Sequence, residues 1–196
     1  DFDYWYMESE KTAVPQTAYN DKPATIPSKI EAENYDVGGH NKAFYDNDRE
    51  NQGKVYREDE VDVVALDESC TTAGQCEFAI GYTQTGEWLE YTVNVTAAGD
   101  YPLTARVASG SNASSFILSV DDKVVSDTIK VPAGEDWDTY SEVEAGKVTL
   151  SAGEHVIRLT ITGDYANIDW VRIGADTTTA LKDRVAFGAN AGTGIA

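Results

Sequence analysis

The sequence has few basic residues and no long apolar run. Its 15 Lys and Arg against 34 Asp and Glu give a formal charge of -19, which repels phosphate backbones and anionic lipid surfaces. No run approaches the roughly 18 apolar residues that cross a bilayer, and the first ten residues lack the basic start and apolar stretch of a signal peptide. These absences argue against nucleic acid or a membrane as a partner and indicate a mature, soluble chain.

Cysteine is also scarce. The two cysteines, Cys70 and Cys76, lie in the polar loop "SCTTAGQC", and an even count at short separation suits a local disulfide formed in an oxidising compartment. We therefore expect a secreted, extracellular protein, with two free thiols as the alternative. A metal pair is less favoured, because His40 and His155 are the only histidines and neither stands at zinc-ligand spacing from the cysteines.

Helical periodicity is missing as well, and period-two alternation takes its place. In "EWLEYTVNV", Leu89, Tyr91 and Val93 fall on one face while Trp88 and Glu90 fall on the other. The segments "GDYPLTARVA", "SFILSVD", "KVTL" and "HVIRLTIT" continue the series, and "SAGE" between the last two is typical of a hairpin turn. Many short strands separated by turn signals predict an all-β fold, an antiparallel β-sandwich.

Both ends of the chain differ from this middle. Residues 1–28 begin with alternating aromatic residues and pass into a Pro- and Thr-rich stretch, which suggests the end of an upstream domain followed by a linker. An extra edge strand on the main sandwich is the alternative. Residues 175–196 lose the alternation and become rich in Thr, Ala and Gly, as a second linker or tail does. We place the folded domain at 29–174.

Three acidic residues are candidates for a cation site. Glu31 and Glu33 stand two apart in a predicted strand, so both carboxylates point to one face. Asp169 likewise follows Asn167 by two in the last predicted strand. A hard cation such as calcium takes six to eight oxygen ligands and would explain the two like charges. A solvated acidic face is the alternative reading.

One large aromatic residue stands in an unexpected place. In "VPAGEDWDTY", Trp137 lies between acidic residues just after a Pro-Ala-Gly turn signal. The acidic residues on both sides of it favour contact with water, where a tryptophan is not expected.

The order of several segments carries a family resemblance. The blocks "KIEAENYD", "VYREDEVDVV", "IGYTQTGEWLEYTVNV", "VPAGEDWDTYSEV", "VTLSAGEHVIRLTI" and "NIDWVRI" resemble, in order and spacing, those of a family 6 carbohydrate-binding module. The likeness covers nearly all of residues 29–174. It implies a jelly-roll β-sandwich with a structural Ca²⁺, whose side-chain ligands match Glu31, Glu33 and Asp169, with backbone carbonyls completing the shell.

The resemblance also implies a sugar site in loops at one end of the sandwich. In the family two aromatic rings clamp a sugar there and an asparagine hydrogen-bonds to it, and the matching residues are Tyr82, Trp137 and Asn167. A pyranose has C–H groups on its faces and hydroxyls on its rim, so flat rings suit the faces and an amide suits the rim. Trp137 would then be exposed because its partner is a ligand. Packing of either ring within the protein is the alternative.

Two further positions bear on ligand choice. Some relatives have a second cleft on the concave sheet face, and the matching residues here are Trp88 and Glu90. The alternative is a tryptophan packed under a loop at the start of its strand. This chain also has Val64 where many relatives carry a carboxylate near the main cleft, which puts the specificity in doubt.

Together these features predict a secreted, monomeric, non-catalytic binding module linked to an upstream catalytic domain, a polysaccharide-degrading glycoside hydrolase. The expected ligand is a plant or algal cell-wall polysaccharide, with xylan or another β-1,4-linked chain as the first guess and β-1,3-glucan or agarose open. One alternative is a calcium-stabilised structural or adhesion sandwich that binds no sugar. Another is an enzyme, because some pair among the 34 carboxylates will stand at the separation that glycoside hydrolysis needs.

Overall fold

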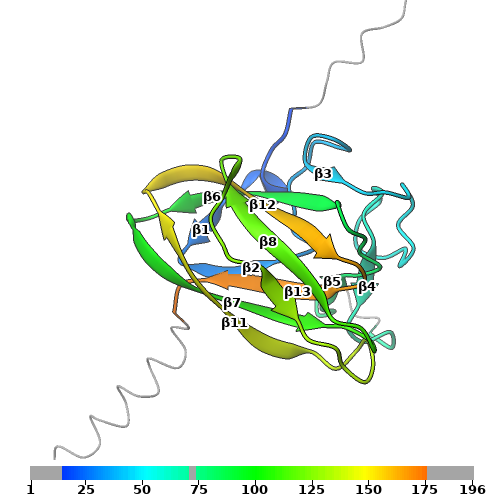
Figure 1. Cartoon of the computed structure of the whole chain (residues 1–196). Coiled ribbons are helices and arrows are strands. Elements are labelled where there is room, and N and C mark those ends of the chain that lie inside the picture. Colours follow the sequence, from blue (N-terminus) through cyan, green and yellow to red (C-terminus); the bar gives the residue numbers. More distant parts are fainter. Residues whose placement is uncertain (1–14, 71–73, 176–196) are drawn as a thin grey trace, which may run out of the picture.

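The computed structural model describes residues 15–70 and 74–175, which form a β-sandwich of two sheets (Figure 1). The expected all-β sandwich of jelly-roll type is confirmed. The elements are η1 (Tyr19–Asp21), β1 (Ala24–Ile26), β2 (Ser28–Glu31), β3 (Phe44–Tyr45), β4 (Val63–Ala65), β5 (Phe78–Ile80), β6 (Trp88–Val95), β7 (Gly99–Ala108), β8 (Ser114–Val120), β9 (Lys123–Val124), β10 (Ile129–Val131), β11 (Ser141–Leu150), β12 (Gly153–Gly163) and β13 (Asn167–Ile173). In this described part, no helix has the length and apolarity to span a membrane.

The two sheets differ in strand order. The seven-stranded sheet runs β1-β6-β12-β8-β10, with β3 added to β6 and β9 added to β8. The six-stranded sheet runs β11-β7-β13-β5-β4, with β2 paired to β13. All pairings are antiparallel except that of β1 with β6. Neighbours in a sheet are therefore mostly distant in sequence, as in a jelly roll.

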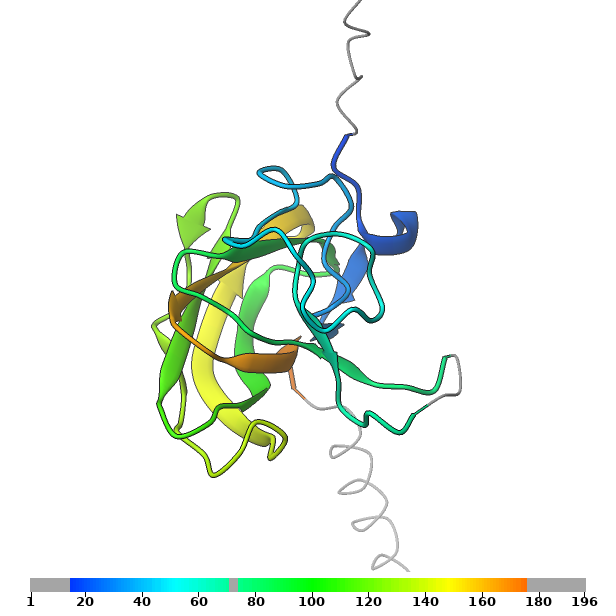
Figure 2. The same ribbon diagram turned by 90° about the vertical axis from the view of Figure 1, so that its right-hand side faces the viewer.

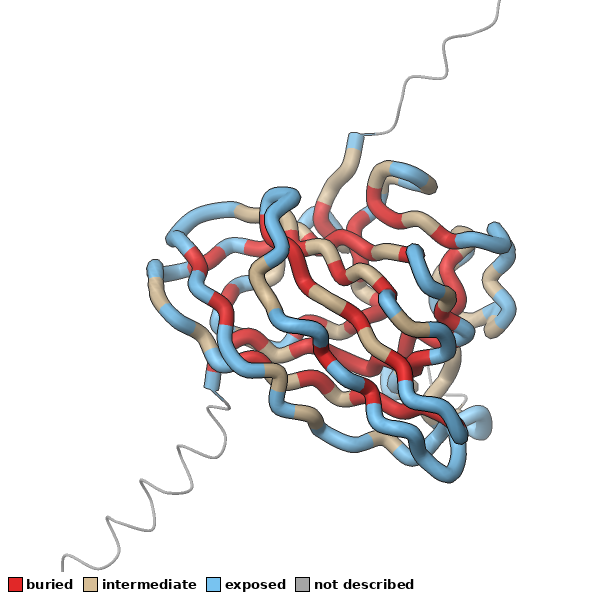
Figure 3. The backbone as a smooth tube through the Cα atoms, viewed as in Figure 1, coloured by how far each residue is buried: buried red, intermediate tan, exposed pale blue. Residues whose placement is uncertain are grey.

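The core lies between the two sheets. In β7 and β12, buried residues alternate with more exposed ones over much of the strand (Figure 3), so one face of each sheet points inward. β13 is buried at six of its seven positions. Phe116, Leu103, Leu159 and Ile168 are among the largest fully buried side chains. Each such side chain stabilises the fold by roughly 1.5–3 kcal/mol through removal of apolar surface from water.

The predicted strands are confirmed, but one predicted connection is wrong. The "SAGE" turn does join β11 to β12, yet β11 pairs with β7 in one sheet and β12 pairs with β6 and β8 in the other. The turn therefore crosses between sheets and closes no hairpin. A turn signal shows where the chain reverses and leaves open which strand becomes the hydrogen-bonding partner.

The folded unit begins earlier than the predicted boundary at residue 29. β1 pairs in parallel with β6, and Thr17 forms a bridge with Val37. Ile26 is fully buried in the main core. The segment before residue 29 is therefore, from residue 15 on, part of the sandwich. Residues 1–14 and 176–196, where we expected the upstream domain end and most of the tail, lie outside the described residues.

The predicted disulfide is present. Cys70 and Cys76 are bonded, with their Cα atoms 5.6 Å apart. The bond lies in the loop between β4 and β5, which projects from the sandwich (Figure 2). Residues 71–73 of that loop lie outside the described residues.

Membership of β1 in the core gives a stability prediction. Ile26→Ala removes a side chain with no exposed surface, so we expect the free energy of unfolding to fall by about 2–5 kcal/mol. Thr25→Ala, at the exposed neighbouring position of the same strand, is the matched control and should change it by less than about 0.5 kcal/mol. Urea denaturation measures both. Equal, small effects would show that β1 is dispensable for the fold.

Candidate functional site

Strand register brings four loops to one end of the sandwich, on the right in Figure 1. β13 begins with Asn167 opposite Ala108, the last residue of β7, and Ile168 lies opposite Ile80, the last residue of β5. The end of β12 pairs with the start of β8, where β10 also ends. The loops that follow β5, β7, β10 and β12 therefore meet at this end.

Trp137, in the loop between β10 and β11, is exposed in the structure. Its side chain keeps 45% of its surface open to solvent. A Cβ added to Gly110 would lie 2.6 Å from Cζ2 and 2.7 Å from Cε2 of the indole, so only glycine lets the ring lie against this backbone. The Asp136 side chain accepts a hydrogen bond from the Thr139 backbone N–H at 2.7 Å. The loop thus holds the indole at the surface.

Tyr82, in the loop after β5, is exposed by 49%. A Cβ added to the preceding Gly81 would lie 3.0 Å from Val64 Cγ1 and 3.1 Å from Asn167 Oδ1. The backbone that carries Tyr82 therefore packs directly on Asn167. Val64, where relatives were expected to carry a carboxylate, lies at the same spot, so this part of the site is apolar in the present chain.

Asn167 connects the two loops. It is buried, and its Nδ2 donates a hydrogen bond to the Trp137 backbone carbonyl at 3.0 Å. Its Oδ1 faces Gly81, beside Tyr82. In this structure, then, the side chain predicted to bind the ligand fastens the Trp137 loop to β13.

Tyr165, in the loop between β12 and β13, joins this group and was missed from the sequence. It is exposed by 52%. Its ring centroid lies 6.3 Å from that of Trp137, with the ring planes at 77°. A single aromatic residue in the turn "GDYA" carries no periodic signal. Its position two residues before Asn167 was the one available clue.

The residues predicted to form a second cleft are occupied by contacts within the protein. The guanidinium of Arg158 lies 4.4 Å from the ring centroid of Trp88, which is half-buried. Glu90 is buried, contrary to its place on the polar face, and accepts hydrogen bonds from Arg158 Nε at 2.8 Å and Gln16 Nε2 at 2.7 Å. Arg158 and the segment before β1 thus contact the outer face of β6 at these two residues.

The three predicted metal ligands surround one cavity of about 400 Å³. β2 ends at Glu31, so Glu33 lies in the following turn and not in the strand as predicted. We expected Asp169 and Asn167 to share a face of β13. A register shift between Ile168 and Trp170 interrupts the alternation at Asp169. The carboxylates still converge, because the β2 end pairs with β13 at Trp170.

Of the three carboxylates around this cavity, one lacks a compensating partner and two are already paired with basic side chains. Glu33 Oε2 is buried without a hydrogen-bond partner, and burial raises the pKa of Glu33 to about 8, helped by Glu31 and Asp169. Glu31 pairs with Lys29 at 2.6 Å, however, and Asp169 pairs with Arg106. No group of three or more His, Cys, Asp and Glu side chains in the described part stands ready to hold a metal. The donor chemistry suits Ca²⁺, and binding would require two ion pairs to open.

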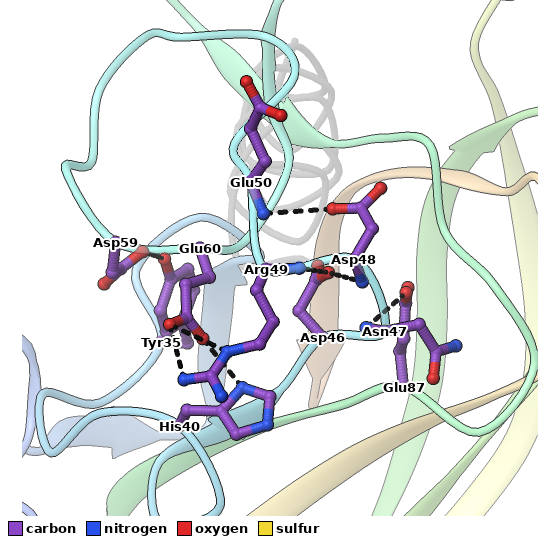
Figure 4. Close-up of polar contacts among 10 residues, drawn as sticks. All are labelled: Tyr35, His40, Asp46, Asn47, Asp48, Arg49, Glu50, Asp59, Glu60 and Glu87. Atoms are coloured by element: carbon purple, nitrogen blue, oxygen red, sulfur yellow. Dashed lines mark hydrogen bonds and ion pairs between the residues drawn. The ribbon is translucent and has the colours of Figure 1, made fainter.

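Acidic side chains also hold the long loop between β3 and β4 in place (Figure 4). Glu60 accepts a hydrogen bond from Arg49 Nη2 at 2.9 Å, and its other oxygen lies 2.8 Å from His40 Nδ1. Asp46 Oδ1 accepts the backbone N–H groups of Asp48, at 3.0 Å, and Arg49. The segment 46–53 therefore starts at a buried residue, Asp46.

Three buried carboxylates lie beneath this loop and next to the candidate site. Asp46, Asp62 and Glu87 line one small cavity together with Gly81. Burial raises the pKa of Asp62 and of Glu87 to about 7, and their negative neighbours add to both shifts. The pKa of each of these two carboxyl groups moves toward neutral pH because burial removes water from the carboxylate and other negative charges lie nearby.

A sequence model described as carbohydrate binding module (family 6) matches residues 63–175, more than half of the chain. Among curated proteins, the beta-agarase AgaO of Microbulbifer thermotolerans is 34% identical over 96 residues, which are 47% of this chain. The match spans only 8% of that agarase.

Solved structures show the same fold. The C-terminal module of the marine laminarinase LamC from Zobellia galactanivorans aligns with a TM-score of 0.54 and 25% identity, covering 76% of this chain and 98% of that one. A β-1,3-glucan-binding module from Bacillus halodurans gives a TM-score of 0.57 at 18% identity, covering 79% of this chain and 100% of that one. A module of Cellvibrio mixtus lichenase 5A, solved with cellotriose, gives 0.54 at 24%, covering 76% and 98%.

The buried carboxylates give a pH prediction. The folded-state pKa of Asp62, about 7, lies above the ordinary aspartate pKa of 3.8, so the folded state keeps a proton that the unfolded chain has released. Stability should therefore fall as pH rises from about 4 through 7. Asp62→Asn keeps the oxygen that accepts the Gln52 N–H and should flatten the dependence. Thermal melting at pH 5 and pH 8 measures it, and parallel losses in both proteins would contradict the assignment.

Proposed function

The chain belongs to the family 6 carbohydrate-binding modules, and on that premise we propose that it binds cell-wall polysaccharide through Trp137 and Tyr82 without catalysing a reaction. The observation that carries the proposal is the exposure of both rings on loops joined through Asn167. Each large apolar ring is held open to water by its loop, where burial would be the favoured state. Such surfaces are typical of ligand sites.

The expected affinity is weak. Stacking on an aromatic ring contributes roughly 0.5–1.5 kcal/mol beyond area burial in protein pairs. Two rings and a few hydrogen bonds then correspond to dissociation constants of about micromolar to millimolar. Tethering to an attached enzyme raises the effective concentration at the polysaccharide. We propose a secreted, monomeric module of this kind, linked to a glycoside hydrolase.

The ligand proposed from the sequence was xylan or another β-1,4-linked chain, with β-1,3-glucan and agarose open. The names of the similar proteins cover part of this range: an agarase, a laminarinase module, a β-1,3-glucan-binding module and a module bound to cellotriose. At Val64 this chain offers the ligand an apolar surface, whereas a carboxylate at that position would accept a hydrogen bond from a sugar hydroxyl. We propose that the ligand is xylan, another β-1,4-linked chain, a β-1,3-glucan or agarose.

Replacing Trp137 tests the site. In native gels containing xylan, laminarin, hydroxyethylcellulose or agarose, we expect at least one polysaccharide to retard the wild-type protein. Trp137→Ala should lose that retardation, an affinity loss of about tenfold or more, because the exposed indole supplies most of the contact area. Trp88→Ala reports on the second cleft and should bind like wild type, since Arg158 already covers that ring.

The melting temperature of each variant should stay close to that of the wild type. Retention of binding in Trp137→Ala would refute the site. Absence of retardation on all four polysaccharides would favour the alternative, a structural sandwich without sugar binding.

We also propose that Glu31, Glu33 and Asp169 hold a structural Ca²⁺. The unpartnered Glu33 Oε2 supports this, because an uncompensated buried carboxylate oxygen is costly. Calcium would supply charge compensation there and tie the end of β2 to β13. The cation would take the places now held by Lys29 and Arg106 beside two of the carboxylates.

Calcium removal tests this second proposal. A cation that binds only the folded state stabilises it by about 2.7 kcal/mol at a hundredfold excess over its dissociation constant, so a chelator should lower the melting temperature by several degrees. Glu33→Gln should make the melting curve insensitive to both calcium and chelator, while Glu142→Gln, on the rim of the same cavity, should keep the response. An identical wild-type curve with and without chelator would remove the metal.

A further inference from the structure

We propose that Tyr165 is a third aromatic wall of the saccharide site and a determinant of its specificity. This rests on the function proposed above. The sugar unit that lies on the indole of Trp137 would meet Tyr165 at its rim, so Tyr165 would select among hydroxyl arrangements and linkages.

The relative orientation of the rings supports this role. The planes of Trp137 and Tyr165 stand at 77°, with centroids 6.3 Å apart. One flat ligand cannot lie on both rings at that angle. A pyranose stacked on one ring therefore presents its hydroxyl rim to the other. The Tyr165 hydroxyl has no hydrogen-bond partner within the described part of the chain and is free to bind a sugar hydroxyl.

The backbone fixes Tyr165 in this position before any ligand arrives. Its N–H donates to the Thr83 carbonyl at 2.6 Å, and the Thr83 hydroxyl accepts the Ala166 N–H at 2.8 Å and lies 2.9 Å from the Ala166 carbonyl. Asp164 accepts hydrogen bonds from the Thr85 backbone N–H and hydroxyl. The loop that carries Tyr165 is thus fastened to the loop that carries Tyr82, and a preorganised wall loses little entropy on binding.

The backbone conformation at Tyr165 is unfavourable for a tyrosine. Its φ is +64°, a left-handed value that costs a bulky residue energy unless its contacts compensate. Tyr56 has a similar φ of +65°, but its ring packs 4.6 Å from that of Phe78 and its hydroxyl donates to Asn34 at 2.6 Å. Tyr165 is half exposed, and within residues 15–70 and 74–175 its ring contacts one other ring, that of Trp137. A ligand contact would account for keeping this ring at a strained position.

The decisive variant is Tyr165→Gly, because glycine adopts a positive φ without strain. It removes the ring while leaving the loop conformation favourable. Titration calorimetry and affinity gels with xylan, laminarin, hydroxyethylcellulose and agarose should show about tenfold weaker binding to the polysaccharide that the wild type binds most tightly, and smaller losses on the others, so that the preference narrows. The melting temperature should equal or exceed that of the wild type. Tyr165→Phe keeps the wall and loses only the hydroxyl, so it should weaken binding by about threefold.

The controls separate the two levels of the proposal. Tyr56→Phe, at an exposed tyrosine with its own strained φ, should bind like wild type. If Tyr165→Gly also binds like wild type while Trp137→Ala does not, the third wall is wrong and the proposed function stands. If the wild type binds none of the four polysaccharides, both fail. Should Tyr165→Gly melt at lower temperature, Tyr165→Asn decides, and its wild-type affinity would overturn the proposal.

Discussion

The pairing of β13 with β7 and β5 is the constraint on which the site depends. β13 starts where those two strands end, so one backbone register places the loops after β5 and β7 beside the turn that enters β13. The loop after β10 is then tied to the same point by one side chain, through the hydrogen bond from Asn167 to the Trp137 carbonyl. Hydrophobic packing between the sheets holds the register, because a slip of one residue would turn the buried face of a strand toward water.

Much of the fold was predictable from the sequence. The segments 88–95 and 99–108 follow period two without interruption, and they form strands at the predicted places. β1 escaped prediction because three residues between prolines give too short a pattern, and its pairing with β6 is set by contacts far along the chain. The connection from β11 to β12 was misjudged for the same reason: pairing partners depend on tertiary packing, which a local turn signal does not encode.

Some residues of the candidate site were predictable from the sequence and others were not. Trp137 stood out because a large apolar ring among acidic residues contradicts its surroundings, and the structure does expose it. Glu90 was wrongly predicted to be exposed. Alternation shows which face of the strand a residue lies on, but it does not show that Arg158 and Gln16 cover that face in the folded protein. Tyr165 gave no periodic signal, and its place two residues before Asn167 was the one clue in the sequence. Its relation to Trp137 exists only after two loops, 28 residues apart in sequence, have been brought together.

The left-handed backbone at Tyr82 and Tyr165, with φ of +50° and +64°, limits how the proposed binding surface can diversify. Most side chains are disfavoured at such positions, whereas Gly and Asn are tolerated. Random substitutions at these two positions are therefore tolerated mainly when they introduce small residues, which would remove the ring contacts to a ligand while the fold stays stable. New preferences would arise more readily at Val64, which lies in an ordinary strand beside the same surface. A library built to change the target of this domain should keep both tyrosines and vary that strand.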